Sequence, residues 1–207
     1  MRRRLFNCFF IVCAALLIGG GLAESAFARD VIRPSSRPLR WELDFEPGDL
    51  RLYVDDRDGN AYLFMTYKVT NNTPQDRVWA PSFILFTDRG SIVKSGDGVP
   101  RRVTEELLDL MGNEFLETQE RVIGDLFQGE GMAKEGLVVW PIQDTRLNQL
   151  RVFVAGVSGE TARINHPITG EPVILRKTQQ RDYIIRGNAL ARGTKPIELV
   201  STTWVMR

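Results

Sequence analysis

Apolar and polar residues alternate with a period of two from Trp41 onward. In "WELDFE", residues 41–46, every second residue is apolar and the residues between them are acidic. This pattern predicts a strand with one buried face and one solvent-exposed face. Residues 50–54 repeat the alternation after Pro47-Gly48. Residues 61–70, "AYLFMTYKVT", carry apolar or aromatic side chains on both faces, which predicts a central strand covered at least partly on both sides.

The stretch "DRDGN" separates two of these predicted strands. Asp56, Asp58 and Asn60 lie two residues apart, a spacing that resembles a calcium-binding loop. A calcium site needs about six to eight oxygen ligands, and no Glu follows at the distance that an EF-hand requires. Asp-Gly between two strand-like runs indicates a hairpin turn instead. We therefore interpret this stretch as a turn and expect no metal site in it.

Further short strand-like runs follow, separated by turn residues. Asp88-Arg89-Gly90 predicts a second hairpin between "SFILFTD" and "SIVKS". The remaining predicted strands are "LVVWP", "QLRVFVAGV", "VILRK", "DYIIRG" and "IELVSTTWVMR". Many short strands with turns between them favour a β-sandwich.

The period changes near residue 101. Thr104 is a candidate N-cap, and acidic residues follow it where the helix dipole favours negative charge. Gly112-Asn113 can end one helix and start another. Apolar residues then recur at helical spacing; they are Val103, Leu107, Leu110 and Met111, followed by Phe115, Leu116, Val122, Ile123, Leu126 and Phe127. We predict a helical insertion over residues 103–127.

Two segments of the chain resemble a known class of domain. "YLFMTYKVTNNTPQDRVWAPSFILFTDRG" contains a strand ending in Val-x-Asn, a polar turn, and a second strand ending in an Asp-x-Gly hairpin, and "AKEGLVVWPI" and "LRVFVAG" follow later. These segments resemble immunoglobulin-like β-sandwich domains of bacterial exported proteins of unknown function. The resemblance covers residues 60–95 and 134–156. It implies a mainly β, immunoglobulin-like antiparallel β-sandwich, interrupted by the helical insertion, and it leaves function open.

The N-terminus has the three parts of a secretory signal. Arg2, Arg3 and Arg4 precede an uncharged apolar run, and "AFA" at residues 26–28 supplies small residues for cleavage. This predicts a signal peptide over residues 1–28, with cleavage after Ala28, and export to the periplasm or the extracellular space. The alternative is an uncleaved membrane anchor, since the apolar run is nearly long enough to span a bilayer. We expect cleavage, and no membrane insertion after it.

The polar, proline-containing residues 29–40 then predict a flexible leader, followed by a single domain over residues 41–207. Both cysteines, Cys8 and Cys13, lie in the predicted signal peptide. The mature chain would therefore have no disulfide, thiolate metal site or cysteine nucleophile. The chain has 27 Lys and Arg against 26 Asp and Glu, and removal of the signal keeps it near neutral. A mixed, neutral chain has no electrostatic footprint for nucleic acid.

Three candidate chemistries arise from the remaining residues. His166 is the single histidine, in the loop-like "NHPITG", and no catalytic partner is recognisable for it. Glu114 and Glu117 belong to an acidic cluster that could serve a hydrolase, but a solvated helix face explains the cluster better. The tryptophans could form a carbohydrate-stacking platform, although their apolar surroundings favour the core; they are Trp41, Trp79, Trp140 and Trp204.

These patterns favour a non-catalytic role. We expect an exported β-sandwich that contacts other proteins or has a structural role in the bacterial cell envelope. A carbohydrate-binding module is the alternative, and a hydrolase that uses carboxylates is the third hypothesis. We expect no catalytic residue, cofactor or metal.

Overall fold

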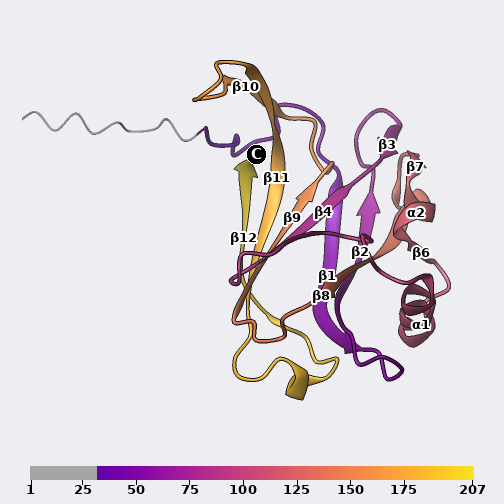
Figure 1. The fold of residues 1–207 in the computed structure, drawn as a ribbon. Coiled ribbons are helices and arrows are strands. Elements are labelled where there is room, and N and C mark those ends of the chain that lie inside the picture. The colour runs from indigo at the N-terminus through magenta and orange to yellow at the C-terminus, as the bar shows by residue number, and fades with distance from the viewer. Residues whose placement is uncertain (1–31) are drawn as a thin grey trace, which may run out of the picture. The chain divides into compact units, whose positions relative to one another are not determined.

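The computed structural model describes residues 32–207, and Ile32–Arg207 forms one compact unit. The predicted signal peptide and its cleavage point after Ala28 lie outside the described residues. The described part is mainly β, with several antiparallel sheets (Figure 1). This arrangement is consistent with a β-sandwich.

The smaller of the two main sheets has four strands, in the order β1-β2-β8-β6. Its strands are β1 (Asp44–Val54), β2 (Ala61–Thr70), β8 (Lys134–Ile142) and β6 (Leu116–Thr118). Strand β2 lies between β1 and β8, and most of its side chains on both faces are buried. The prediction of a central, doubly covered strand at residues 61–70 is confirmed.

The larger sheet has six strands, in the order β10-β11-β9-β4-β5, with β12 paired to β11. Its strands are β4 (Ser82–Thr87), β5 (Ile92–Lys94), β9 (Gln149–Ala155), β10 (Thr161–Asn165), β11 (Pro172–Ile184) and β12 (Glu198–Met206). A third, two-stranded sheet pairs β3 (Arg77–Trp79) with β7 (Gly124–Leu126). Two 3-10 turns, η1 (Glu130–Met132) and η2 (Leu190–Arg192), complete the elements outside the helical region.

The main core lies where the two larger sheets face each other. Leu63 and Met65 of β2 belong to the same buried cluster as Phe83 of β4 and Val152 of β9. A second, smaller cluster lies under helix α1 (Arg101–Met111), on the other face of β2 and β8, and contains Leu107. Strand β2 therefore supplies buried side chains to both clusters.

The prediction of a helix over residues 103–127 is wrong for most of its second half. Helix α1 ends at Gly112, whose positive φ of 61° suits a glycine C-cap. Strand β6, the short helix α2 (Gln119–Val122) and strand β7 follow. Phe115 and Phe127 are at least half exposed, so the apolar spacing does not mark one helix face. The proposed cap is also wrong, because Pro100 precedes the helix and Thr104 lies inside it.

The "DRDGN" turn joins β1 to β2, as predicted, and also holds helix α1. The backbone N–H of Asp55 donates to the carbonyl of Asn60 across the turn, and Gly59 has a φ of 70°. Arg102 of α1 lies 2.5 Å from the Asp55 carboxylate and 3.5 Å from that of Asp58. The hydrogen bond from Arg102 is the main reason that the pKa of Asp55 lies below its usual range. The guanidinium of Arg102 therefore pairs with the carboxylates of Asp55 and Asp58 in this turn.

Gly136 of β8 allows a close contact between the strand and an aromatic ring. A Cβ atom at this position would collide with the ring and hydroxyl of Tyr67, whose hydroxyl accepts a hydrogen bond from Trp79 Nε1 at 3.2 Å. We expect Gly136→Ala to lower the free energy of unfolding by about 2 kcal/mol, as other overpacking substitutions do. Gly131→Ala is the matched control, because nothing lies within 4 Å of its added Cβ. Urea denaturation of both variants measures the difference, and equal stabilities would contradict the expectation.

Candidate interaction surface

The face of the six-stranded sheet that points away from the core presents an ordered row of side chains. Strand register places Phe86 of β4 beside Arg151 of β9, Arg151 beside Asp182 of β11, and Asp182 beside Ser201 of β12. The alternation of side chains along each strand puts these residues on the face opposite the core residues Leu85 and Val152. Four strands, distant in sequence, therefore build one row, which we call the outer row.

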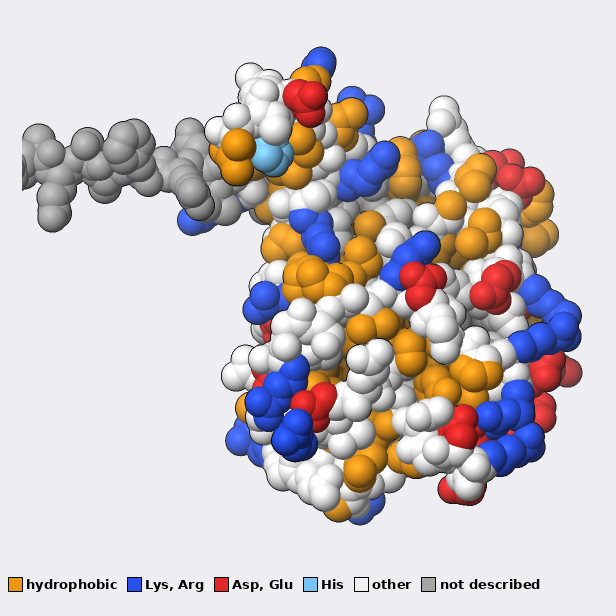
Figure 2. Space-filling view, viewed as in Figure 1, with side chains coloured by type: hydrophobic (Ala, Val, Ile, Leu, Met, Phe, Trp, Pro, Cys, Tyr) orange, Lys and Arg blue, Asp and Glu red, His pale blue; other side chains and the backbone are white. Residues whose placement is uncertain are grey.

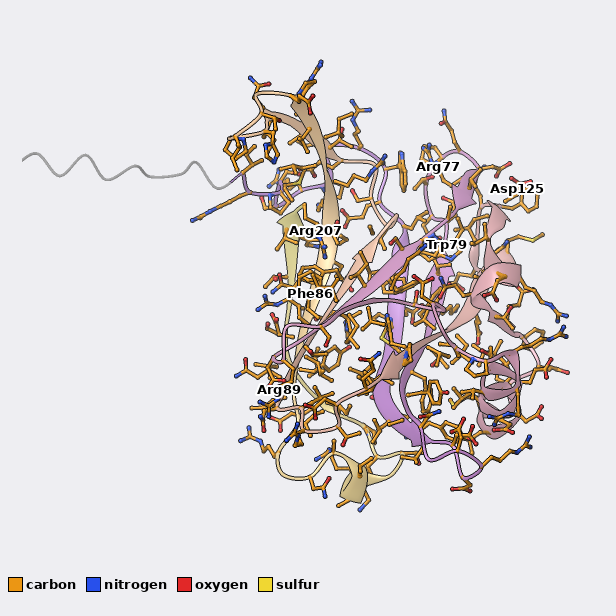
Figure 3. All side chains as sticks on the ribbon, in the orientation of Figure 1. Arg77, Trp79, Phe86, Arg89, Asp125 and Arg207 are labelled. Atoms are coloured by element: carbon orange, nitrogen blue, oxygen red, sulfur yellow. The ribbon has the colours of Figure 1, made fainter. Side chains whose placement is uncertain are left out.

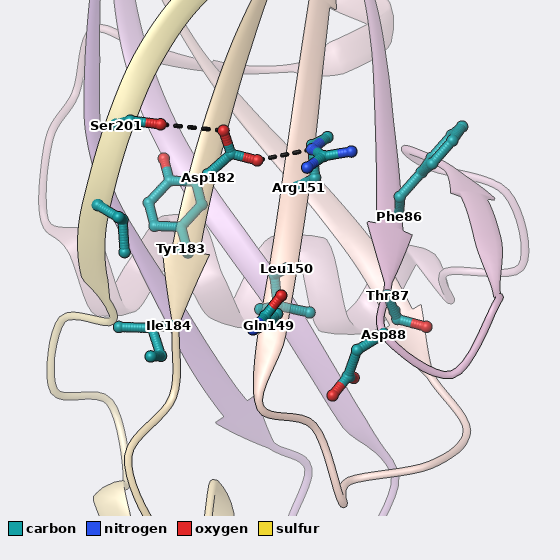
Figure 4. Close-up of a pocket in the computed structure, with 11 residues that line it drawn as sticks. Phe86, Thr87, Asp88, Gln149, Leu150, Arg151, Asp182, Tyr183, Ile184 and Ser201 are labelled. Carbon is teal, nitrogen blue, oxygen red and sulfur yellow. Dashed lines mark hydrogen bonds and ion pairs between the residues drawn. The ribbon is translucent and has the colours of Figure 1, made fainter. Parts of the chain in front are cut away.

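Hydrogen bonds fix the polar part of the outer row. Asp182 accepts from Arg151 Nε at 2.6 Å, from Gln180 Nε2 at 2.9 Å and from Ser201 Oγ at 3.0 Å. Figure 4 shows two of these contacts across the three strands. Partial burial alone would raise the pKa of Asp182, but the hydrogen bonds outweigh it and hold the pKa below its usual range. The carboxylate is therefore charged and oriented at neutral pH.

The aromatic part of the same face lies under the C-terminal arginine. Phe86 and Phe153 meet edge to face, with ring centroids 5.0 Å apart. The guanidinium of Arg207 lies 4.0 Å from the Phe153 centroid and 5.1 Å from that of Phe86. Figure 3 labels Arg207 and Phe86 on this side of the molecule. Cation–π contact of this kind holds Arg207 against the sheet.

A pocket of about 450 Å³ opens at one end of the outer row. Its lining comes from β4, β9, β11 and β12 and from the residues just beyond β4; it includes Phe86, Asp88, Gln149, Arg151, Asp182, Val200 and Ser201 (Figure 4). Val200 is 61% exposed, so an apolar side chain stands at the rim beside fixed polar groups. This combination of apolar contact area and oriented hydrogen-bonding groups suits recognition of another molecule.

The opposite, core-facing side of β11 is unusually polar. Lys177 is 2% exposed, and its ammonium lies 2.9 Å from Glu42 and 3.5 Å from Glu160. Arg181 is 8% exposed and donates to the hydroxyls of Tyr183 at 2.8 Å and Thr202 at 3.3 Å. Two basic residues thus lie at inward positions of one strand.

The Lys177 cluster also holds the segment predicted to be a flexible leader. The carbonyl of Ser35 accepts from Lys177, and the backbone N–H and hydroxyl of Ser35 both donate to Glu160. Part of residues 29–40 is therefore in contact with the domain.

The candidate catalytic residues from the sequence do not come together. His166 lies in the β10–β11 turn, where its Nδ1 accepts from the backbone N–H groups of Ile168 and Thr169. This histidine therefore organises its own turn. Glu114 lies in the turn after α1 and Glu117 lies on β6, and both are exposed.

The tryptophans do not form an exposed platform. Trp79 and Trp140 are fully buried in the main core. Trp41 and Trp204 are partly buried against it, and each has a cation over its ring, from Arg77 in the first case and from Lys177 in the second. The interpretation of Trp140 as a core residue is confirmed, whereas Trp41, also expected in the core, is only partly buried against it.

Within residues 32–207, no group of three or more His, Cys, Asp or Glu side chains is arranged to hold a metal ion. No helix in this part of the chain is long and apolar enough to cross a membrane. On the visible face, Lys and Arg side chains lie beside Asp and Glu without a large block of one sign (Figure 2).

Sequence reasoning did not identify the outer row. Its residues belong to four strands, and only the strand register brings them together. The one local signal was the alternation of "QLRVFV", which places Arg151 on the opposite face from Leu150 and Val152. Comparisons with known proteins add no assignment: no family model, no curated protein and no solved structure matches the chain.

Proposed function

We propose that this chain is an exported, non-catalytic protein of the bacterial cell envelope that binds another protein through the outer face of its six-stranded sheet. The domain is immunoglobulin-like, with the α1–α2 region as an insertion between sandwich strands. The signal-like N-terminus supports export. The observation that carries the binding role is the outer row, where an oriented Asp182 lies beside the exposed Val200 at the rim of the pocket.

The proposed binding surface combines polar side chains that are held in place with an exposed apolar side chain. Strand pairing fixes Arg151, Asp182 and Ser201 before any partner arrives, so little side-chain entropy is lost on binding. Val200 supplies apolar area that gains from being covered. Protein interfaces combine such apolar contacts with hydrogen-bonding groups around them.

Site-specific crosslinking tests this function. A photo-reactive amino acid at Val200 should capture a protein partner in the native cell, whereas the same group at Leu110 of α1 should not. Leu110 is a matched control, because it is also apolar and 56% exposed but lies outside the larger sheet. After mass spectrometry identifies the captured protein, its affinity is measured with purified Val200→Glu and Leu110→Glu variants.

We expect Val200→Glu to weaken binding at least about tenfold, because the carboxylate would be desolvated beside Asp182 at the interface. Leu110→Glu should leave affinity unchanged. Capture at Leu110 alone, or equal affinities of the two variants, would rule out the outer face as the binding surface.

A carbohydrate-binding module is the second candidate, and one observation favours it. Phe86 lines the same pocket as Gln149, Asp88 and Arg151, and sugars are bound by aromatic side chains together with hydrogen bonds to their hydroxyls. Affinity electrophoresis in polysaccharide gels separates the two candidates. Retardation that disappears in Phe86→Ala would favour the carbohydrate role over the protein role.

A further inference from the structure

Strand β12 is an open edge of the larger sheet. Among the described residues it pairs only with β11. It is nine residues long, contains no Pro or Gly, and has Glu198 at its first position as its one charged residue. A long edge strand with so little charge presents unpaired backbone N–H and C=O groups to other chains.

The register shows which backbone groups face the open edge. Arg176 and Arg207 exchange both backbone hydrogen bonds. In antiparallel pairs, such residues alternate with residues whose backbone groups point away from the partner strand. Counting back from Arg207, the N–H and C=O groups of Met206, Trp204 and Thr202 therefore point outward. No backbone or side-chain hydrogen bond from the described residues reaches these groups.

Other sheet edges in the described chain are shorter or protected; the edge strand β10 has only five residues, one of which is the charged Arg163. Strand β1 has a register shift between Pro47 and Leu50 and carries Asp44, Glu46 and Asp49. Bulges, prolines and charges are the devices by which proteins prevent pairing at an edge. Strands β5 and β6 are only three residues long. Strand β12 has none of these protections along Thr202–Met206.

A buried cation lies next to this edge. Arg181 pairs with Thr202 in register, and its guanidinium donates to the Thr202 hydroxyl. No carboxylate of residues 32–207 lies within 4.0 Å of this guanidinium, in contrast to the neighbouring Lys177. Its Nε and Nη1 donate to the hydroxyls of Tyr183 and Thr202, and Nη2 makes no hydrogen bond with residues 32–207. A largely buried guanidinium without a carboxylate has lost water without gaining a counter-charge.

We propose that β12 accepts an extended segment of a partner protein as an added strand, and that an acidic side chain of this segment pairs with Arg181. The proposal rests on the protein-binding function above and specifies the partner segment. A residue placed opposite Thr202 points its side chain to the same face as Thr202, about 5 Å away. A carboxylate there reaches the guanidinium, and a charge-assisted hydrogen bond forms in a poorly solvated place.

Two fluorescein-labelled ten-residue peptides test the proposal. Both alternate Thr and Val; one has a central Glu, and the other has Gln at the same position. Fluorescence polarisation should show that the Glu peptide binds the wild-type protein about tenfold more tightly. Arg181→Gln should remove this difference between the peptides. Arg176→Gln is the matched control on the same strand, and it should preserve the difference because Arg176 is exposed.

Thr202→Pro tests the edge itself. Its N–H points away from β11, so proline removes a donor from the edge without removing a backbone hydrogen bond of the sheet. The variant also removes the hydroxyl that accepts from Arg181. Both peptides should lose binding to this variant. Hydrogen exchange on the wild-type protein provides a second measurement that does not depend on folding of the variant. The Glu peptide should slow exchange at the amides of Thr202, Trp204 and Met206.

Four outcomes would overturn the proposal. Equal binding of the two peptides, or binding of neither, contradicts the pairing with Arg181. Protection at β1 or β5 instead of β12 contradicts the choice of edge. A wild-type dimer that Thr202→Pro converts to monomer, and that the peptide does not dissociate, identifies a second copy as the occupant. If the protein captured through Val200 binds Thr202→Pro and Arg181→Gln at wild-type affinity, the protein-binding function stands and strand addition fails.

Discussion

The Lys177→Met variant is expected to lose about 3 kcal/mol of unfolding free energy, because it leaves the buried Glu160 and the partly buried Glu42 without their cation. The Lys177 ammonium lies 2.9 Å from Glu42 and 3.5 Å from Glu160, and it donates to the carbonyl of Ser35 at 3.3 Å. It also lies 4.8 Å from the centre of the Trp204 ring. Methionine fills a similar volume but cannot replace any of the polar contacts.

Urea denaturation measures this loss, with Lys94→Met as the control. Lys94 lies on β5 of the same sheet and is exposed, so its replacement should change stability little. The variant should also free the segment around Ser35, and limited proteolysis should then cleave before Trp41 faster than in the wild type. Equal stabilities of the two variants would show that the Lys177 cluster does not stabilise the fold.

The same cluster gives a pH dependence with a defined sign. Burial alone would raise the pKa of Glu160, but the contacts with Ser35 and Lys177 outweigh it and lower the pKa below its ordinary value of 4.5. A carboxylate with a lowered pKa contributes stability that is present above its unfolded pKa and is lost as the pH falls through the folded value. The wild type should therefore lose more stability than Lys177→Met as the pH falls below 4.5.

The second large effect is expected from Asp55→Asn. Asp55 is 1% exposed, contacts Arg102 at 2.5 Å and accepts from the backbone N–H of Arg57 at 3.0 Å. Asparagine keeps the shape of the side chain but removes the charge that Arg102 faces. We expect the melting temperature to fall by several degrees and the amides of α1 to exchange faster, because the helix loses its main polar contact with the hairpin turn.

Asp56→Asn is the control within the same turn. Asp56 is exposed and makes no ion pair or hydrogen bond with the described residues, so the melting temperature of Asp56→Asn should match that of the wild type.

The pH test uses the lowered pKa of Asp55, whose largest cause is the hydrogen bond from Arg102. Stability from this pair should be lost as the pH falls below the ordinary value of 3.8, and Asp55→Asn should lack that loss. A wild-type melting temperature in Asp55→Asn would contradict the role of the pair.

The local patterns predicted the elements whose partners are close in sequence. The hairpins at residues 56–60 and 88–90 and the central strand at residues 61–70 follow from turn chemistry and alternation alone. The second half of the predicted helix failed because Leu116 and Leu126 belong to three-residue strands. Such strands are too short to show a period of two, and their pairing with β8 and β3 is distant in sequence.

The burial of polar side chains on β11 could not be predicted from the sequence for a different reason. "VILRK" and "DYIIRG" predicted two strands, whereas residues 172–184 form one. Lys177 and Arg181 occupy inward positions, where alternation requires apolar side chains. Their burial depends on Glu42, Glu160 and Thr202 from other segments. A basic residue at an inward position of a strand was therefore the sequence feature that indicated a buried polar cluster. The residues that complete this cluster are known only from tertiary contacts.

The order of strands in the two sheets has a consequence for how quickly the chain folds. Strands β1 and β2 are neighbours in sequence, but Leu63 of β2 faces Trp140 of β8, and Leu85 of β4 faces Val152 of β9. Each of these pairings closes a long loop before its contacts are gained, and this loop-closure entropy makes sheets of high contact order slow to form. We infer a folding time on the order of milliseconds to seconds, as for other proteins dominated by non-local strand pairs. The β1–β2 hairpin can form early, and β12, which follows the other described strands in sequence, completes the larger sheet.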